Sequence, residues 1–562
     1  MDSGKRSHEE TSTANDSNRK KVKGSLPQLA SSSSLSSPVE SVACLKLLAT
    51  DQDLQIRQAH RDDPHHWSRS QCETLRELIG FDRNPSSSNG HSRAIDFLVM
   101  GNYLVNFALL LDEMPELISL SRLVIFYGIA ETPPGQLKAL MGDALDLVPL
   151  DPSACPGSPT NPTQHKIPYG VHHSKFFLVG YSSSTHSTQQ QSSPPTMRVV
   201  IHTANMCFAD DHLKAQAAYR QDFPKKTPPA SDKDTTTNEP PSSFEATLVD
   251  YMDSYKFQEP REFVPGQGKT FLRHVLRQYD YSSACVELIP STPGYHKLVA
   301  PERQGHLKVR QCIARHIPTS LNATGSKLIC QFSSMGSLTE KYLQDELQSS
   351  LTAGNLPPHI KTSLDRLQLV YPTVAEIRQS IEGYRGGGSV PGTVAYTRKP
   401  FLKPLYHRWT MTPSYYIHER KNKTNKNHQH YPNPLAKPRN VPHIKTWCQT
   451  GGAEDPDALA YWIITSHNLS KAAWGTIQNS TKYGERRLFV RHWELGVFVA
   501  PSLLLCHRLV PFGCPHAQPG DLTVPLPYDL HPQPYQADDE PWAWDELQPI
   551  PDRFGRRSCK DM

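Results

Sequence analysis

The stretch Tyr169-Gly-Val-His-His-Ser-Lys-Phe-Phe177 and the later stretch Val441-Pro-His-Ile-Lys-Thr-Trp447 share one pattern, a histidine followed two positions later by a lysine. In both stretches an apolar or aromatic segment begins soon after the lysine. A single His-x-Lys is expected by chance in a chain of this length, but its repetition in a matching context is typical of an internal duplication. The sequence therefore predicts two related halves, each with one copy of the pattern.

A second shared feature lies downstream of each copy. Val199-Val-Ile-His-Thr-Ala-Asn205 in the first half and Tyr461-Trp-Ile-Ile-Thr-Ser-His-Asn468 in the second are apolar runs that end in a threonine and an asparagine. Residues i and i+2 of a strand face the same side, so each histidine is expected beside its lysine. Packed with pseudo-twofold symmetry, the two halves would surround one phosphate-sized anion with six polar side chains. These are His173, Lys175, Asn205, His443, Lys445 and Asn468.

Short runs rich in valine, isoleucine and phenylalanine recur along the chain, with helical patterns between them. The amphipathic runs Tyr103–Asp112 and Tyr342–Leu351 are predicted helices. Strands that alternate with helices are typical of an α/β fold, here two similar α/β domains, each with a mixed sheet flanked by helices. The predicted strands are Arg93–Met100, Arg122–Tyr127, Lys175–Val179, Arg198–Ile201, Val286–Ile289, Leu367–Val370, Ala460–Thr465, Arg487–Val490 and Leu495–Val499.

Composition divides the chain into a tail and two domains, at residues 1–44, 45–289 and 290–562. The tail is rich in serine, threonine, asparagine and charge, so we expect it to be disordered. It contains Lys5-Arg6 and, after a spacer, Arg19–Lys23, which is the spacing of a bipartite nuclear import signal. Three polar segments are expected to be surface insertions, near residues 182–196, 227–243 and 419–434.

Charge and hydropathy exclude several classes of protein. The 60 lysines and arginines against 55 acidic residues leave a net charge of only +5, unlike a uniformly basic histone-like protein. The longest apolar stretch, Leu495–Cys506, is shorter than the roughly 18 residues of a membrane span, and the N-terminus lacks the apolar core of a secretory signal. The 11 cysteines form no Cys-x-x-Cys pair, so we expect a soluble intracellular protein with reduced thiols.

One group of potential metal ligands lies near the C-terminus. Cys506 and His507 are followed by Cys514 and His516. This spacing matches no common zinc finger, and the first pair lies in an apolar run. The sequence therefore predicts no metal site.

The repetition of histidine and lysine across two halves resembles the phospholipase D superfamily. Most of its members have an aspartate five positions after the lysine, where this chain has Gly180 and Thr450. This absence, the paired asparagines and further motifs resemble the tyrosyl-DNA phosphodiesterase branch, from about residue 94 to about residue 555. The motifs are Ser291-Thr-Pro-Gly294, Gln331-Phe-Ser-Ser-Met-Gly-Ser-Leu338, Glu382-Gly-Tyr384, Gly386–Ser389, Asn468-Leu-Ser-Lys-Ala-Ala-Trp-Gly475 and Trp493-Glu-Leu-Gly-Val497.

The resemblance implies two phospholipase D-like domains and a DNA repair phosphodiesterase that hydrolyses the 3′-phosphotyrosyl bond between DNA and stalled topoisomerase I. Other 3′ adducts are an expected extension. His173 would be the nucleophile and form a phosphohistidine, His443 would donate and accept protons, and His172 would be structural. These roles require His173 neutral and His443 protonated, which modest shifts from a pKa of about 6.5 would arrange. The lysines and asparagines would stabilise the phosphoryl charge without a metal or other cofactor, since no carboxylate pair is tied to either motif.

The resemblance also implies partners for the two histidines and contacts for the DNA. Glu494 would pair with His173, and Gln216 with His443, so that each imidazole keeps one tautomer. Tyr169 would stack on a base of a single-stranded or gapped DNA end. Further DNA contacts would come from Ser333, Ser334, Ser337, Ser470 and Lys471.

Two alternatives remain open at the level of sequence. One is a phospholipase D-type nuclease or lipid phosphodiesterase, against which the missing aspartates weigh. The other is a catalytically silent DNA-end binding module, against which the six intact polar positions weigh. We expect a nuclear monomer with no membrane partner. The basic residues of the third insertion are expected to be a solvated loop, although they could attract DNA nonspecifically; they are Arg420, Lys421, Lys423 and Lys426.

Overall fold

The computed structural model describes residues 40–41, 43–48, 72–81, 94–183, 194–227, 241–257, 271–299, 301, 303–318, 325–353, 363–409, 440–453, 455–512, 514 and 516–561. Nearly all of the predicted tail, including its import signal, lies outside these residues. So do most of the first two predicted insertions and the whole of the third. Within the described ranges, no helix is long and apolar enough to cross a membrane.

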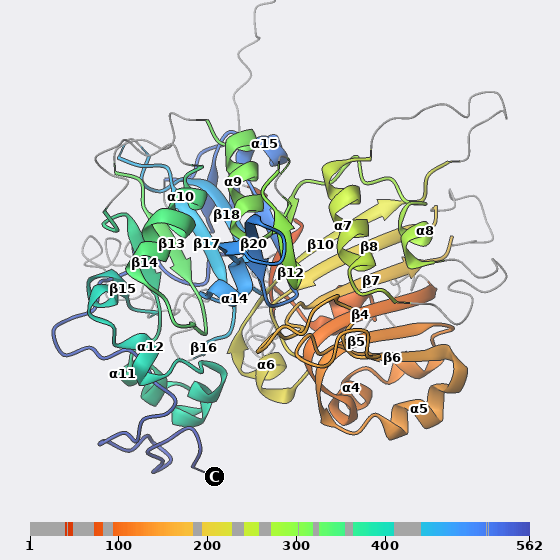
Figure 1. The fold of residues 1–562 in the computed structure, drawn as a ribbon, viewed down its shortest axis with the longest axis horizontal. Coiled ribbons are helices and arrows are strands. Elements are labelled where there is room, and N and C mark those ends of the chain that lie inside the picture. Colours follow the sequence, from red (N-terminus) through yellow and green to blue (C-terminus); the bar gives the residue numbers. More distant parts are fainter. Residues whose placement is uncertain are drawn as a thin grey trace, which may run out of the picture. The chain divides into compact units, whose positions relative to one another are not determined.

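Two mixed sheets share one strand order (Figure 1). The first sheet runs β3 (Cys72–Glu73), β2 (Leu45–Leu48), β10 (Ala217–Pro224), β8 (Thr196–His202), β7 (Phe176–Tyr181), β4 (Ile95–Asn106), β5 (Leu123–Thr132), β6 (Leu145–Pro149). The second runs β11 (Glu287–Ser291), β21 (Glu494–Val499), β18 (Leu459–Thr465), β17 (Thr446–Thr450), β13 (Leu328–Gln331), β14 (Leu367–Val370), β15 (Tyr406–His407).

The two sheets correspond strand for strand, apart from β3 at one edge of the first. β4 pairs in parallel with β5 and antiparallel with β7, and β13 pairs in the same way with β14 and β17. The antiparallel pair β7 and β8, with Phe177 opposite Val200, corresponds to β17 and β18, with Trp447 opposite Ile463. The duplication inferred from two short motifs therefore extends over both whole sheets.

Three large hydrophobic cores among the described residues lie between the layers, and alternate residues of a strand enter different cores. Phe176 and Leu178 of β7 enter the core that both sheets share, whereas Phe177 enters the outer core of the first sheet. The shared core also receives α7 (Ser243–Asp253) and α8 (Leu272–Leu276). Strands such as β17, β18 and β21 are buried along their whole length, which explains their continuous apolar sequences.

Helices cover the outer face of each sheet (Figure 1). On the first sheet these are α3 (Leu75–Ile79), α4 (Phe107–Glu113) and α5 (Gly135–Met141), with the short 3₁₀ turns η1 (Pro115–Ser119) and η2 (Gly142–Ala144). On the second sheet they are α9 (Gly305–His316), η4 (Tyr342–Gln348), α10 (Ser349–Leu351), α11 (Val374–Gln379) and η6 (Pro400–Leu405).

The remaining elements are short, and their strands belong to neither of the two large sheets. They are β1 (Glu40–Ser41), α6 (Phe208–His212), β9 (Lys214–Ala215), β12 (Gly294–Lys297), η5 (Gly383–Ser389), α12 (Val394–Thr397), β16 (Val441–Pro442), α14 (Lys471–Trp474), β19 (Thr476–Ser480), β20 (Glu485–Val490), α15 (Pro501–Leu504), β22 (Leu509–Pro511) and β23 (Leu522–Val524). β16 pairs with β9 and so joins the second half to the first.

Every predicted strand overlaps a strand of the structure, and three local differences have physical reasons. The helix expected from Tyr103 begins only at Phe107, because β4 continues to Asn106, whose side chain caps the helix. The predicted boundary between residues 289 and 290 divides β11, a strand that pairs with β21 and belongs wholly to the second sheet. At the other end, Glu40–Ser41 of the predicted disordered tail pairs with β23.

A buried ion pair between Lys214 of β9 and Glu382 also links the halves, and Lys214 donates a second hydrogen bond to the carbonyl of Gly386 at 3.2 Å. Replacing Lys214 by methionine leaves the Glu382 carboxylate buried without its cation. We expect Lys214→Met to destabilise the protein by about 3–5 kcal/mol. Denaturant unfolding measures this, with Lys138→Met at an exposed position as the control. An equal, small effect of both variants would contradict a stabilising role for the pair.

Candidate active site

Both His-x-Lys patterns lie at the same place in their sheets. His173 and Lys175 directly precede β7, and the second pair directly precedes β17. Because β7 and β8 are antiparallel, the start of β7 meets the end of β8, and the His202 amide donates to the Lys175 carbonyl at 3.0 Å. The Thr465 amide makes the equivalent bond in the second half, at 3.1 Å. Each asparagine, three residues beyond its strand, therefore lies next to the pattern of its own half.

The two lysines are completely buried, and each donates to the carbonyl of the histidine two residues earlier. Lys175 Nζ lies 2.7 Å from the His173 carbonyl oxygen, and Lys445 bonds in the same way to His443. Burial lowers the pKa of Lys175 to about 8. Burial and then the charge of Lys175 lower the pKa of Lys445 well below its usual value. Ammonium groups that affect each other in this way belong to one site, and that site favours an anion.

His173 is held by a carboxylate from the other half. Its Nδ1 lies 2.8 Å from Glu494 Oε2, which also accepts a hydrogen bond from Ser466 Oγ at 2.5 Å. Burial and then the charges of the two lysines lower the pKa of His173 well below its usual value. The imidazole is therefore neutral near pH 7. With the Nδ1 proton donated to Glu494, the lone pair of Nε2 is available as a nucleophile.

His443 has two neighbours at Nδ1, and the sequence predicted only one of them. Gln216 Nε2 lies 3.0 Å from His443 Nδ1, and the carboxylate of Asp210 lies 2.9 Å from it. Burial alone would raise the pKa of Asp210, but His443 and the Asn205 amide outweigh it and hold the carboxyl ionised. The ionised Asp210 carboxylate can accept a hydrogen bond from the Nδ1–H group of His443, whereas the NH₂ group of Gln216 cannot.

Asp210 was missed because its position gives no local signal. It lies five residues after Asn205, in the first turn of the short helix α6. Its carboxylate accepts a hydrogen bond from the backbone N–H of Asn205 at 2.7 Å. An aspartate near a helix start is usually read as an interaction with the helix backbone. Glu494 was the predicted partner of His173, whereas the contact of Asp210 with His443 was not predicted.

The two side chains that orient the histidines, Glu494 and Gln216, have equivalent partners in the two halves. Glu494 accepts from Ser466, and the Gln216 Oε1 atom accepts from Thr203 Oγ1 at 2.7 Å. Both hydroxyl residues stand two positions before the asparagine of their half. Each half therefore supplies a His-x-Lys pattern, an asparagine, and the group that orients the histidine of the other half.

Asn468 is fixed by the segment that follows β13. Its Oδ1 accepts from the amides of Ser333 and Ser334, at 3.2 and 2.9 Å, and from the Ser333 hydroxyl at 3.2 Å. This bonding identifies which atom of the Asn468 side chain is the amide oxygen. It also directs the Asn468 NH₂ group away from the two serines. Ser333 is 1% exposed. Its hydroxyl is bonded to Asn468 inside the protein, and its contact with DNA stays a prediction.

The other predicted DNA contacts lie on more accessible positions. Tyr169 is 84% exposed and has a left-handed backbone with φ of 62°, which is uncommon for a tyrosine. Ser337 is exposed and accepts from Lys399 Nζ at 3.2 Å, while Ser334 is half-buried. Ser470 caps α14 by accepting from the Ala473 amide at 3.1 Å, which leaves its hydroxyl proton available to donate.

Two further side chains complete the surroundings of His173. His172 is fully buried between the Asn102 carbonyl and the Tyr255 hydroxyl, at 3.0 and 2.9 Å, and its pKa is lowered to about 3 by burial. This is the structural position expected for it. The ring of Tyr103 lies 5.3 Å from the His173 ring, a contact that the sequence did not predict because Tyr103 was assigned to a helix.

Two clusters of metal-ligand types occur among the described residues, and neither includes the histidines or lysines of this site. One comprises Glu113, Asp211 and His212, and the other comprises Asp457, Cys514 and His516.

The fold and site together define a phosphodiesterase of the phospholipase D type, with two similar domains that each contribute one His-x-Lys pattern. The sequence profile described as tyrosyl-DNA phosphodiesterase matches residues 70–536, and the chain belongs to this family. It is therefore a hydrolase, a phosphodiesterase of DNA repair. The alternatives of a lipid phosphodiesterase and a silent binding module are not favoured by this assignment.

Individual relatives agree with the assignment. Tyrosyl-DNA phosphodiesterase 1 of Arabidopsis thaliana is 29% identical over 531 residues, which cover 87% of this chain and 74% of the plant protein. The Drosophila melanogaster protein of the same name is 27% identical, over 68% of this chain and 58% of its own length. The crystal structure of yeast tyrosyl-DNA phosphodiesterase has the same fold, with a TM-score of 0.58, 15% identity, and coverage of 89% of this chain and 99% of the yeast chain.

The lowered lysine pKa predicts how anion binding depends on pH. Lys175 attracts an anion only while protonated, and its pKa of about 8 brings the loss of that proton well below the value of about 10.4 for an exposed lysine. Sulfate keeps the same charge over this range. We expect its competitive inhibition constant to rise as the pH passes about 8. Lys175→Gln should bind sulfate weakly at every pH. If the sulfate inhibition constant of wild type did not change between pH 7 and 10, the assignment of Lys175 as the anion-binding cation would be contradicted.

Proposed function

We propose that this chain hydrolyses the 3′-phosphotyrosyl bond between DNA and stalled topoisomerase I, and other 3′ adducts, through a covalent phosphohistidine on His173. The observation that carries the proposal is the meeting of two His-x-Lys pairs at one buried, positively charged site, with each imidazole oriented by the opposite half. Splitting one displacement into two easier ones is the general advantage of such covalent catalysis.

In the first step, His173 Nε2 attacks phosphorus while Glu494 holds the Nδ1 proton. The P–N bond forms, and the bond from phosphorus to the tyrosine oxygen breaks. His443 Nε2 gives its proton to the departing phenolate. The DNA stays on His173 as a phosphohistidine, and the tyrosine with its peptide leaves.

This step requires a protonated His443, which the free site does not favour. Burial and the two lysines together lower the pKa of His443 to about 4, although Asp210 raises it. The expectation that modest shifts leave His443 protonated is therefore not met in the free site. A bound phosphodiester brings one negative charge, which offsets the lysines and raises the pKa of His443. In this proposal the substrate itself helps to place the proton that the leaving group needs.

In the second step, the neutral His443 accepts a proton from water through Nε2, and Asp210 accepts the hydrogen bond from Nδ1. The oxygen of this water attacks phosphorus, the P–N bond breaks, and DNA with a 3′-phosphate is released. His443 regains its proton and His173 returns to its neutral form. Microscopic reversibility requires one group to act as acid and then as base in this way.

Charge on the phosphoryl oxygens is countered by Lys175 and Lys445, with the amides of Asn205 and Asn468 as neutral donors. Such preorganised donors each contribute on the order of 10²–10³ in rate. The two ammonium groups lie where many phosphoryl-transfer sites place a cation. We therefore propose that the reaction needs no metal.

The DNA end is proposed to approach past Tyr169, Ser337 and Ser470. The exposed Tyr169 ring offers a stacking surface worth about 1–3 kcal/mol per base, and Ser337 lies beside the ammonium of Lys399. Hydroxyl and lysine contacts to phosphate carry no sequence information. A single-stranded or gapped 3′ end of any sequence is thus the proposed substrate, and the basic residues at 5–6 and 19–23 are proposed to direct the monomer to the nucleus.

An oligonucleotide with a 3′-phosphotyrosine tests the reaction, with excess chelator present throughout. Wild type should release a 3′-phosphate. His443→Ala should accumulate a covalent adduct of DNA with the protein, because the phosphohistidine forms but loses the base that activates water. His173→Ala should form no adduct, as judged by denaturing gel electrophoresis. Activity only after addition of a divalent metal, or an adduct that survives in His173→Ala, would overturn the mechanism.

The role of Asp210 is tested by Asp210→Asn, which keeps the size of the side chain and removes its charge. We expect kcat to fall at least about 10²-fold, because the His443 tautomer and the stabilisation of its imidazolium are both weakened. Asp210 raises the pKa of His443. Removing the Asp210 charge should therefore lower the pKa of His443. The alkaline limb of the pH–rate profile, which depends on protonated His443, should then shift to lower pH. Asp211→Asn is the matched control, and an unshifted limb with unchanged kcat would show that Asp210 has no positioning role.

A further inference from the structure

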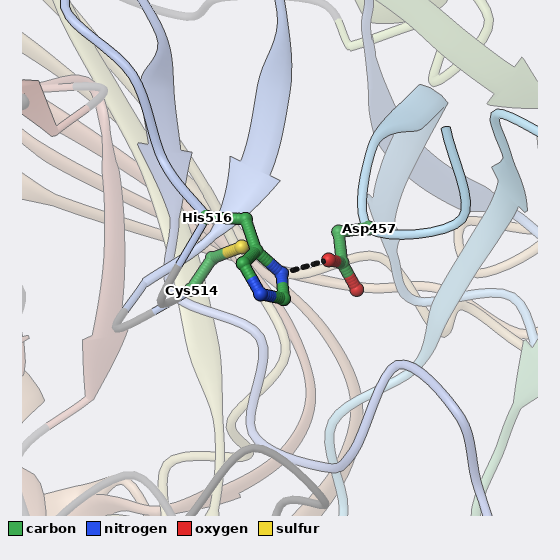
Figure 2. Close-up of side chains that lie close together, drawn as sticks. All are labelled: Asp457, Cys514 and His516. Carbon is green, nitrogen blue, oxygen red and sulfur yellow. Dashed lines mark hydrogen bonds and ion pairs between the residues drawn. The ribbon is translucent and has the colours of Figure 1, made fainter. Parts of the chain in front are cut away.

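Four side chains of metal-ligand type meet in the second half, outside the site described above. Asp457 lies just before β18, Cys514 and His516 lie between β22 and β23, and His531 follows β23. His516 Nδ1 lies 2.7 Å from one oxygen of Asp457, and His531 Nε2 lies 3.4 Å from the other. The ligand atoms of Asp457, Cys514 and His516 all lie within 4.8 Å of one another (Figure 2).

This cluster differs from the one that the sequence presented. The spacing of Cys506-His507 with Cys514 and His516 matched no zinc finger, and the first pair does not belong to the cluster. Two residues distant in sequence, Asp457 and His531, take their place. A search for local spacing cannot find such a set, because its members come from three separate segments.

An ordinary ion pair explains only part of the arrangement. A carboxylate between two imidazoles needs no metal, and His516 and His531 alone would account for Asp457. The sulfur of Cys514 has no part in such a pair, yet Cys514 is 9% exposed and its side chain points to the same place as the other two (Figure 2). Thiolate, imidazole and carboxylate are together the donor set that zinc prefers.

The segment that carries two of the donors is held from outside the cluster. Arg508 donates to the carboxylates of Asp455 and Asp521, at 3.0 and 2.8 Å, and to the backbone carbonyl of His516 at 3.0 Å. Asp521 in turn accepts from the Gln518 amide at 2.7 Å. This network positions the backbone around His516 whether or not the donor atoms bond to each other.

The distances require only a small contraction. Zinc binds sulfur at about 2.3 Å and nitrogen or oxygen at about 2.0–2.2 Å, so tetrahedral ligands lie roughly 3.3–3.8 Å apart. The donor atoms of Asp457, Cys514 and His516 already lie within 4.8 Å of one another, and His531 Nε2 lies 3.4 Å from Asp457, so rotation of the four side chains can reach this spacing. On binding, zinc replaces the thiol proton of Cys514 and the hydrogen bond between His516 and Asp457.

We propose that Asp457, Cys514, His516 and His531 form a four-coordinate zinc site. Four protein donors leave no open coordination position, so the role is structural and not catalytic. The metal would clamp the segment after β22 to the start of β18, the strand that leads to Asn468. The clamped segment continues to Tyr528, whose hydroxyl lies 2.7 Å from Thr446 Oγ1, next to Lys445. Zinc would thereby stabilise the second half without taking part in phosphoryl transfer.

Metal binding is tested on the full chain without an affinity tag, after treatment with a chelator and its removal. We expect wild type to bind one equivalent of Zn²⁺ by calorimetry and to unfold at a higher temperature with zinc than without. Co²⁺ in place of zinc should give a thiolate-to-cobalt charge-transfer band. Cys514→Ser should abolish this band and weaken zinc binding at least about tenfold. Cys506→Ser, in the neighbouring half-buried loop, is the matched control and should retain both.

His531→Ala tests the fourth ligand and should replace the tetrahedral cobalt spectrum by one of higher coordination. The proposal is overturned if wild type binds no stoichiometric zinc, if Cys514→Ser keeps the charge-transfer band, or if His531→Ala leaves the cobalt spectrum unchanged. Phosphodiesterase activity should persist in Cys514→Ser at a temperature where it stays folded. This readout separates failure of the zinc site from failure of the proposed reaction.

Discussion

The two halves exchange backbone hydrogen bonds directly beside each histidine, and the geometry of the site depends on this exchange. The His173 amide donates to the carbonyl of Trp493 at 2.9 Å, which places the next residue, Glu494, on the imidazole. In the other direction, the His443 amide donates to the carbonyl of Ala215 at 3.2 Å, which places Gln216. Backbone pairing is directional and short, so it fixes the distance between groups that are hundreds of residues apart in sequence.

Burying two ammonium groups at this joint is unfavourable in the absence of an anion, and both catalytic histidines are affected. Burial lowers the pKa of His173, and the charges of Lys175 and Lys445 lower it further. The nucleophile is neutral as a result. The same effects remove the proton from His443 in the free site, and only the nearby Asp210 opposes them. A bound phosphate brings negative charge that offsets the two ammonium groups. The protonation of the histidines therefore depends on whether the anionic substrate is bound.

The six polar side chains were predicted from motifs that occur twice. The contacts that the resemblance implied for the two histidines, with Glu494 and Gln216, are present in the structure. Sequence reasoning missed Asp210, whose contact with His443 spans the joint between the halves and leaves no spacing signal. It also did not predict the bond of the Ser333 hydroxyl to Asn468 inside the protein. The start of the helix at Phe107 was misplaced for a related reason: β4 is extended by its pairing with β5, which local propensity does not report.

The sequence by itself determined the duplication, the two His-x-Lys patterns and the α/β class, since each rests on spacing within a few residues of one strand. The tertiary structure alone decided that Asp210 meets His443, which hydroxyls remain accessible, and that Asp457 and His531 join Cys514 and His516. Spacing along a strand is set by the local backbone, which repeats every two residues. Meetings between segments distant in sequence are set by the packing of two sheets over a shared core, and no local pattern encodes them.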